Sequence, residues 1–176
     1  IHFVSKDAMD IKSFGEANVR KFYDLGLLKD VPGIYQLDFD AIGKLEGFGK
    51  KSIENLLTAI ENSKTQPLHR LIYALGIRYV GETTAKTLSN AVNHLLDFKN
   101  FSEAELQNLE DVGKKVAGSI ELFFHDTANL KMLEQLEKMG ISLKNQKKQL
   151  ALNDKLAGQT FLFTGTMPTL KRGDAE

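Results

Sequence analysis

Apolar residues recur at helical spacing along most of the first 140 residues, and short glycine-containing turns interrupt them. In the segment 50–63, Ile53, Leu56, Leu57 and Ile60 fall at the spacing of one helix face. Further helices are expected at 5–9, 16–25, 34–37, 40–44, 68–75, 82–92, 103–108, 114–124 and 127–139. N-caps are expected at Ser5, Asp40 and Ser102, and helix-ending glycines at Gly26 and Gly140. The pattern predicts a mainly α-helical fold.

Four of the glycine turns repeat one pattern. Their last glycines are separated by 34, 32 and 32 residues: Gly15, Gly49, Gly81 and Gly113. An apolar residue stands one and four positions before each glycine, and again four and seven positions after it. Five aligned columns in four copies indicate a true repeat, in which a turn ends in glycine and opens a helix with one buried face. We therefore predict four hairpins, at 11–15, 45–49, 77–81 and 109–113.

The hairpin ends have the chemistry of an anion site. A helix that starts directly after glycine presents free backbone N–H groups and its positive dipole end, which suits a phosphate. Pairs of lysines follow the second and fourth glycines: Lys50, Lys51, Lys114 and Lys115. Cations are disfavoured in a first helical turn, so the pairs indicate an anion docked before them, with a merely solvated face as the alternative. Glu16 and Glu82 follow the other two glycines, so those copies are expected to be more structural, with Arg78 offsetting Glu82.

The repeated unit resembles the helix-hairpin-helix motif, whose family holds DNA phosphates on hairpin N–H groups without regard to sequence. The family's Gly-apolar-Gly is complete only at Gly47-Phe48-Gly49, because Ser13, Tyr79 and Asp111 replace the first glycine elsewhere. The strongest phosphate contact is therefore expected at the second hairpin. The resemblance implies the following DNA-binding residues: Gly15, Gly47, Gly49, Lys50, Lys51, Arg78, Gly81, Gly113, Lys114 and Lys115.

The C-terminal stretch has a different character. Residues 144–155 are polar and lysine-bearing and are expected to form a linker after a helix-hairpin-helix domain at 1–143. Residues 160–163 have a β pattern, and with the following Thr164-Gly165 they resemble the opening of a BRCT domain. That resemblance implies Thr164 and Gly165 as candidate phosphate ligands. Residues 156–176 are too few to bury a sheet, so we expect this truncated strand to pair with a neighbouring chain.

The order of these parts resembles the C-terminal half of bacterial NAD-dependent DNA ligases. The amino-acid sequences of the stretches 2–11 and 71–82 also resemble those of the family. The resemblance implies a parent enzyme that seals nicks in DNA during replication and repair. NAD adenylates a lysine in another domain, AMP passes to the 5′-phosphate, and the 3′-hydroxyl displaces it with Mg²⁺ assistance. A four-cysteine zinc module would precede this segment. Nicked duplex DNA and the other domains of the parent chain are the implied partners.

Composition adds limits to this interpretation. The chain has no cysteine and no Lys-x-Asp-Gly motif, so it is expected to hold no NAD, Mg²⁺ or Zn²⁺ and to be inactive alone, as a piece of a longer protein. The four histidines show no ligand spacing, and no apolar run suits a membrane span. A cytoplasmic, nucleoid-associated location follows from the resemblance.

The net charge of zero leaves other functions open. It favours a protein-interaction scaffold built from degenerate helix-hairpin-helix repeats. A repair nuclease subunit or glycosylase using the same repeats is a third possibility. A glycosylase would carry a catalytic Asp or Lys after its hairpin, and no Asp or Lys in this sequence stands out in that role.

Overall fold

The computed structural model describes residues 1–145, within a helical unit that spans Ile1–Gln146. Its α-helices are α1 (Glu16–Asp24), α2 (Phe39–Ile42), α3 (Lys50–Ser63), α4 (Leu68–Ala74), α5 (Glu82–Ala91), α6 (Glu103–Gln107), α7 (Lys114–His125) and α8 (Thr127–Lys138). Its 3₁₀ helices are η1 (His2–Val4), η2 (Pro32–Gln36) and η3 (Leu95–Asn100). In this described part the extended pairing is one isolated bridge between His94 and Lys144. The mainly α-helical prediction is therefore confirmed.

The expected strand at 160–163, with Thr164 and Gly165, lies outside the described residues, as does all but the start of the expected linker. The division of the chain into domains thus stays a prediction. Within residues 1–145, no helix combines the length and the apolar character that crossing a membrane requires.

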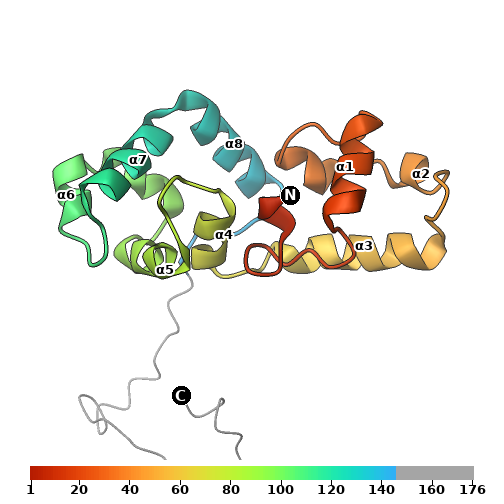
Figure 1. Cartoon of the computed structure of the whole chain (residues 1–176), viewed down its shortest axis with the longest axis horizontal. Coiled ribbons are helices and arrows are strands. Elements are labelled where there is room, and N and C mark those ends of the chain that lie inside the picture. The colour runs from red at the N-terminus through yellow and green to blue at the C-terminus, as the bar shows by residue number, and fades with distance from the viewer. Residues whose placement is uncertain (146–176) are drawn as a thin grey trace, which may run out of the picture. The chain divides into compact units, whose positions relative to one another are not determined.

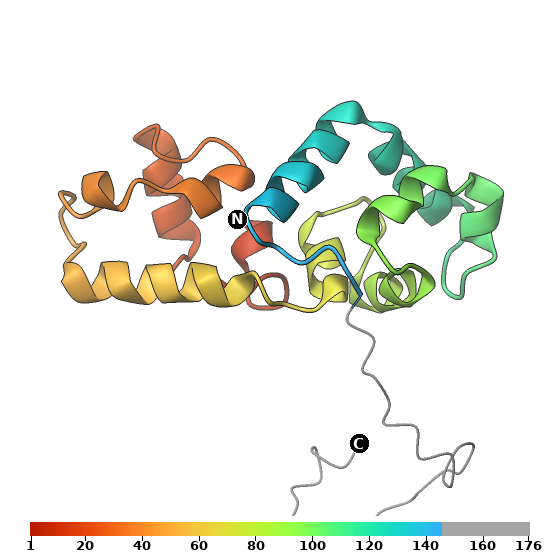
Figure 2. The same cartoon turned by 180° about the vertical axis from the view of Figure 1, so that it is seen from behind.

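Two helical clusters follow one another along the unit. Figure 1 shows α1 and α2 on one side of the long α3, and Figure 2 shows the same arrangement from behind. In the second cluster α4 packs on α5, and α7 packs on α6, η3 and α8. The clusters are joined where η1 meets α4 and where η2 meets α8.

The repeated apolar columns form the core. Seven positions after each hairpin glycine, the side chain is no more than 1% exposed: Phe22, Leu56, Leu88 and Ile120. The residue directly before the glycine is buried in three copies and half-buried at Phe48. The repeated apolar columns therefore correspond to one buried helix face in each unit. Leu57 departs from the prediction at 39% exposed, since α3 buries a face too narrow to include it.

Segment 5–9 forms turns instead of the predicted helix. Asp10 has φ +48, which ends any helical path, and Met9 N–H donates to the carbonyl of Phe3. The Arg70 guanidinium, from α4, donates hydrogen bonds to the carbonyls of Lys6 and Ala8. These carbonyls are thus satisfied by a distant side chain rather than by a helical ladder.

Helix caps account for the other differences. Asp38, not Asp40, caps α2, with its Oδ1 accepting from the N–H groups of Asp40 and Ala41 at 3.0 Å. The helix η3 was not expected, and it is capped by the His94 ring. The Ser102 capping box is confirmed, and Gly26 and Gly140 stand at helix ends with φ +71 and +94.

Candidate nucleic-acid interface

All four predicted hairpins have the same backbone geometry. In each, the residue before the glycine donates its N–H to the carbonyl three residues earlier, at 3.0–3.2 Å. The third residue of each turn is left-handed, as in a type II turn, with φ values of +64, +88, +65 and +61 at Ser13, Gly47, Tyr79 and Asp111. The three replacements of the family glycine therefore leave the path of the chain unchanged. The left-handed turn is thus common to all four hairpins, and the ranking of the second hairpin above the others stays a prediction.

The helices that follow the hairpins begin without side-chain caps. Helices α1, α3, α5 and α7 have glycine N-caps with extended ψ, and no side chain accepts from their first-turn N–H groups. Of the other α-helices, α2, α6 and α8 are capped by Asp38, Ser102 and Asp126, whereas α4 begins after Pro67 without a side-chain cap. The hairpin helices thus have unused donors at a positive dipole end, which is the arrangement that accepts an anion.

Neither backbone strain nor packing requires glycine at these four N-caps, although glycine is a better N-cap than alanine. Their φ values lie between −71 and −89, which any residue adopts. A methyl group placed on Gly15, Gly49, Gly81 or Gly113 would meet nothing within 4 Å. A side chain is therefore excluded neither by backbone strain nor by internal packing, and the free room lies outside the molecule.

The charges at the hairpin exits differ between copies. The four lysines of the two pairs are exposed, and within residues 1–145 none of them forms an ion pair. Glu16 instead pairs with Arg20 at 2.7 Å, so the first turn of α1 is internally neutralised. Arg78 is exposed, and its guanidinium lies 4.9 Å from the centroid of the Tyr79 ring. Unpaired lysines are thus concentrated at the second and fourth hairpins, although the fourth also carries exposed Glu110 and Asp111.

Hairpins one and two lie side by side, which the sequence did not indicate. The Lys21 ammonium donates to the carbonyl of Glu46 at 3.0 Å and lies 5.2 Å from the Phe48 ring centroid. The Phe22 ring is 5.5 Å from Phe14 and 5.2 Å from Phe48. Side chains of α1 therefore join the two turns. A cavity of about 390 Å³ lies between them, lined in part by Ser13, Asn18, Gly47, Ser52 and Asn55.

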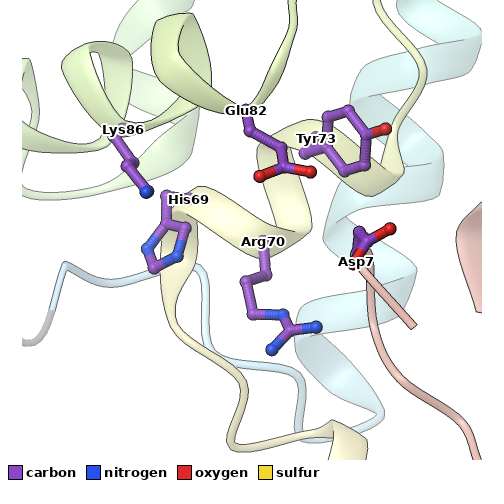
Figure 3. A pocket seen from close by; sticks show the side chains of 6 residues that line it. All are labelled: Asp7, His69, Arg70, Tyr73, Glu82 and Lys86. Atoms are coloured by element: carbon purple, nitrogen blue, oxygen red, sulfur yellow. The ribbon is translucent and has the colours of Figure 1, made fainter. Parts of the chain in front are cut away.

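A smaller pocket lies beside the third hairpin's helix, between α4, the start of α5 and the 5–9 turns (Figure 3). Its volume is about 170 Å³, and it is lined by Asp7, His69, Arg70, Tyr73, Glu82 and Lys86. Burial lowers the pKa of His69, and the charges of Lys86 and Arg70 lower it further against the opposing effect of Glu82. The volume is below that of ordinary small-molecule sites. The mixed charges and the Arg70 bonds to the turn carbonyls indicate a structural junction.

Two of the histidines join segments that are distant in sequence. The His94 Nε2 lies 2.8 Å from a Glu137 carboxylate oxygen, and the His2 Nε2 lies 2.8 Å from the Tyr73 carbonyl. The described residues contain no group of three or more His, Cys, Asp or Glu side chains that would hold a metal ion.

Comparison with known proteins agrees with this architecture. A family model described as "Helix-hairpin-helix motif" matches residues 70–133, which include the third and fourth hairpins. The whole chain is 56% identical to a DNA ligase of Sulfurihydrogenibium azorense, covering 25% of that protein. It is 52% identical to a DNA ligase of another Sulfurihydrogenibium strain and 49% identical to one of Persephonella marina, again over all 176 residues and covering 25% and 24% of those proteins.

The chain thus spans about a quarter of the length of these curated relatives. The matched region covers all 176 residues of the chain and therefore includes every hairpin and helix described above. The chain belongs to the bacterial DNA ligase family, as a segment that carries helix-hairpin-helix motifs.

Proposed function

We propose that the helical unit binds duplex DNA by its phosphates, without regard to base sequence. The observation that carries this proposal is the set of four uncapped helix N-termini, each behind a glycine with open space before it. A phosphate oxygen would accept the first-turn N–H groups, and a side chain at the N-cap would stand in its way. Such contacts fix the protein on the duplex and read no base edge.

Lysines supply the second part of the proposed grip. Exposed Lys50 and Lys51, and likewise Lys114 and Lys115, would displace counterions from the phosphates, so affinity should fall steeply with salt. The second and fourth hairpins therefore bind most strongly. The first hairpin binds DNA less strongly, because Glu16 replaces the lysines at its exit and takes up the charge of Arg20. Because α1 joins hairpins one and two, their phosphate sites have a fixed spacing, which suits the two strands on either side of a minor groove.

For the parent protein we propose an NAD-dependent ligase that seals nicks, in which this segment holds the nicked duplex. NAD, Mg²⁺ and a structural Zn²⁺ would belong to other parts of that protein. The present chain does not fit them, since it has no cysteine, no Lys-x-Asp-Gly and, among residues 1–145, no metal-binding cluster. The other domains of the parent are partners in this proposal, and its location is cytoplasmic, at the nucleoid.

The proposal is tested by gel shift on intact and nicked duplexes over a salt series. Reversing Lys50 and Lys51 to Glu should weaken binding to both duplexes and reduce the slope of log K against log salt by roughly 2. A matched control reverses two exposed lysines away from the hairpins, Lys29 and Lys131. The Lys50→Glu/Lys51→Glu variant must lose more affinity than this control. Equal affinity of that variant and the unsubstituted chain at low salt would refute the proposal.

A second function is favoured by two observations. The net charge is zero, and Leu122 on α7 is 76% exposed, as expected of a protein-interaction scaffold. If no duplex shifts at low salt while the chain stays folded, the scaffold replaces DNA binding as the proposal.

A further inference from the structure

The third hairpin carries an aromatic side chain at its tip. Tyr79 occupies the left-handed turn position, with φ +65, and is 53% exposed. The same position holds small residues in the other hairpins: Ser13, Gly47 and Asp111. Glycine takes this conformation freely, whereas a bulky residue there is uncommon. Tyr79 is therefore a poor choice for the turn itself.

The core does not explain the ring either. Tyr79 stands outside the buried cluster that holds its neighbours Ile77 and Val80. Its one described aromatic or cationic neighbour in residues 1–145 is Arg78, whose guanidinium lies 4.9 Å from the ring centroid. This cation–π contact steadies an exposed ring at the surface. The pair thus presents a flat, positively backed aromatic face outside the fold.

The third hairpin also differs in charge. It lacks the lysine pair of the second and fourth hairpins, and Glu82 occupies the first position of its helix. Phosphate attraction is consequently weaker here. The phosphate contact of this hairpin therefore gains from a second kind of interaction, and an aromatic face offers stacking on a base, which tolerates any sequence.

We infer that the third hairpin contacts DNA by stacking, with the Tyr79 ring against a base face at a break in the duplex. This inference rests on the proposed DNA binding. In a continuous duplex both faces of each base are covered, and opening a step is costly. Where one strand is interrupted, the terminal base unstacks more easily. The Tyr79 and Arg78 pair therefore gives a preference for nicked or gapped duplex over intact duplex, while the other hairpins hold both equally.

The test uses the whole chain and three duplexes of one sequence: intact, nicked and gapped by one nucleotide. Tyr79→Gly removes the ring and suits the left-handed turn, so the fold is retained. Tyr79→Phe keeps the ring. Tyr23→Ala, at a tyrosine 64% exposed on α1, is the matched control. Affinity is measured by fluorescence anisotropy, and 2-aminopurine at the 3′ terminal base of the nick reports stacking.

We expect Tyr79→Gly to lose about fivefold or more of the preference for interrupted duplex. Its intact-duplex affinity, salt slope and melting temperature should not fall. Tyr79→Phe and Tyr23→Ala should keep the preference, and the 2-aminopurine signal should change on binding only when the ring is present.

The inference is overturned if Tyr79→Gly retains the preference, if it weakens all three duplexes equally, or if the unsubstituted chain shows no preference. These outcomes differ from failure of the proposed function, in which the unsubstituted chain binds no duplex at low salt.

Discussion

Replacing Gly49 with alanine separates the needs of the fold from those of DNA binding. Gly49 has φ −83 and ψ 171, and an added methyl group meets nothing within 4 Å. Alanine at a compatible position stabilises by about 0.4–1 kcal/mol through the unfolded chain. Alanine is also a poorer N-cap than glycine, by roughly 1 kcal/mol. The two effects oppose each other, so the free energy of unfolding should change by less than about 1 kcal/mol.

Binding should respond far more strongly. The methyl group would occupy the space from which a phosphate approaches the N–H groups of the first turn of α3. A hydrogen bond to a charged group contributes about 1.5–3 kcal/mol. Loss of one such contact corresponds to a roughly tenfold to hundredfold weaker affinity.

The assay pairs thermal unfolding with duplex binding at fixed salt. Gly118→Ala is the control, because Gly118 lies within α7 and its added methyl group is 4.0 Å from the nearest atom outside its helix, a Glu103 carboxylate oxygen. That substitution should stabilise by about 0.5–1 kcal/mol and leave affinity unchanged. Unchanged affinity in Gly49→Ala would refute the argument that the empty space at this N-cap serves a phosphate. Equal losses in both variants would also refute it.

Three further substitutions test the structure. Asp111→Gly should raise the free energy of unfolding by about 1 kcal/mol in chemical denaturation, because it relieves a left-handed residue with φ +61; a loss of stability would show that the Asp111 side chain supports the turn. The lowered pKa of His69 means that the unfolded chain binds the proton more tightly, so stability should fall as pH drops below about 6.5. His69→Gln should flatten that part of the melting-temperature profile, and an identical profile would contradict the assignment. Burial raises the pKa of Tyr35 to about 12, against the lowering effect of its hydrogen bond with Ser63. Stability should therefore fall between pH 10 and 12 less steeply in Tyr35→Phe, and an absorbance titration at 295 nm should lose a component with a midpoint of about 12.

Much of the fold was readable because the sequence repeats itself. The helix at 50–63 was predicted with its observed bounds, and the column that contains Phe22 and Leu56 is buried throughout. Periodicity reports burial when a helix packs on one side. It fails at Leu57, because the width of the buried face depends on neighbours that are distant in sequence.

Most of the remaining differences also arise from long-range contacts. The turns at 5–9 depend on Arg70, more than 60 residues away in sequence. The cap of η3 is local, since His94 Nδ1 accepts from the N–H of Leu96, but histidine is not a usual N-cap residue. The other nitrogen of the His94 ring meets Glu137, which is 43 residues away in sequence. The side-by-side placement of hairpins one and two was hidden for the same reason, since Lys21 contacts Glu46 across the repeat boundary.

The candidate site was found through its residue types, but its strongest argument needed coordinates. Sequence placed glycines before helices, and it ranked Gly47-Phe48-Gly49 first because both glycines are present. The structure shows that Ser13, Tyr79 and Asp111 adopt the same left-handed conformation. It also shows open space at each N-cap glycine. Which hairpins contact DNA stays a prediction.

The long-range bonds of Arg70 and His2 set an order of events during synthesis. The carbonyls of Lys6 and Ala8 have no partner until Arg70 is made, 60 or more residues later. The His2 ring likewise has no partner until Tyr73 is made. In the same way, the N–H of Leu95 waits for the carbonyl of Leu143. A chain emerging at about 5–20 residues per second therefore spends several seconds with its first turns unpaired. Each hairpin can form as it appears, but the first turns of the chain are completed only after Arg70 and Tyr73 are made, and the bond at Leu95 only after Leu143.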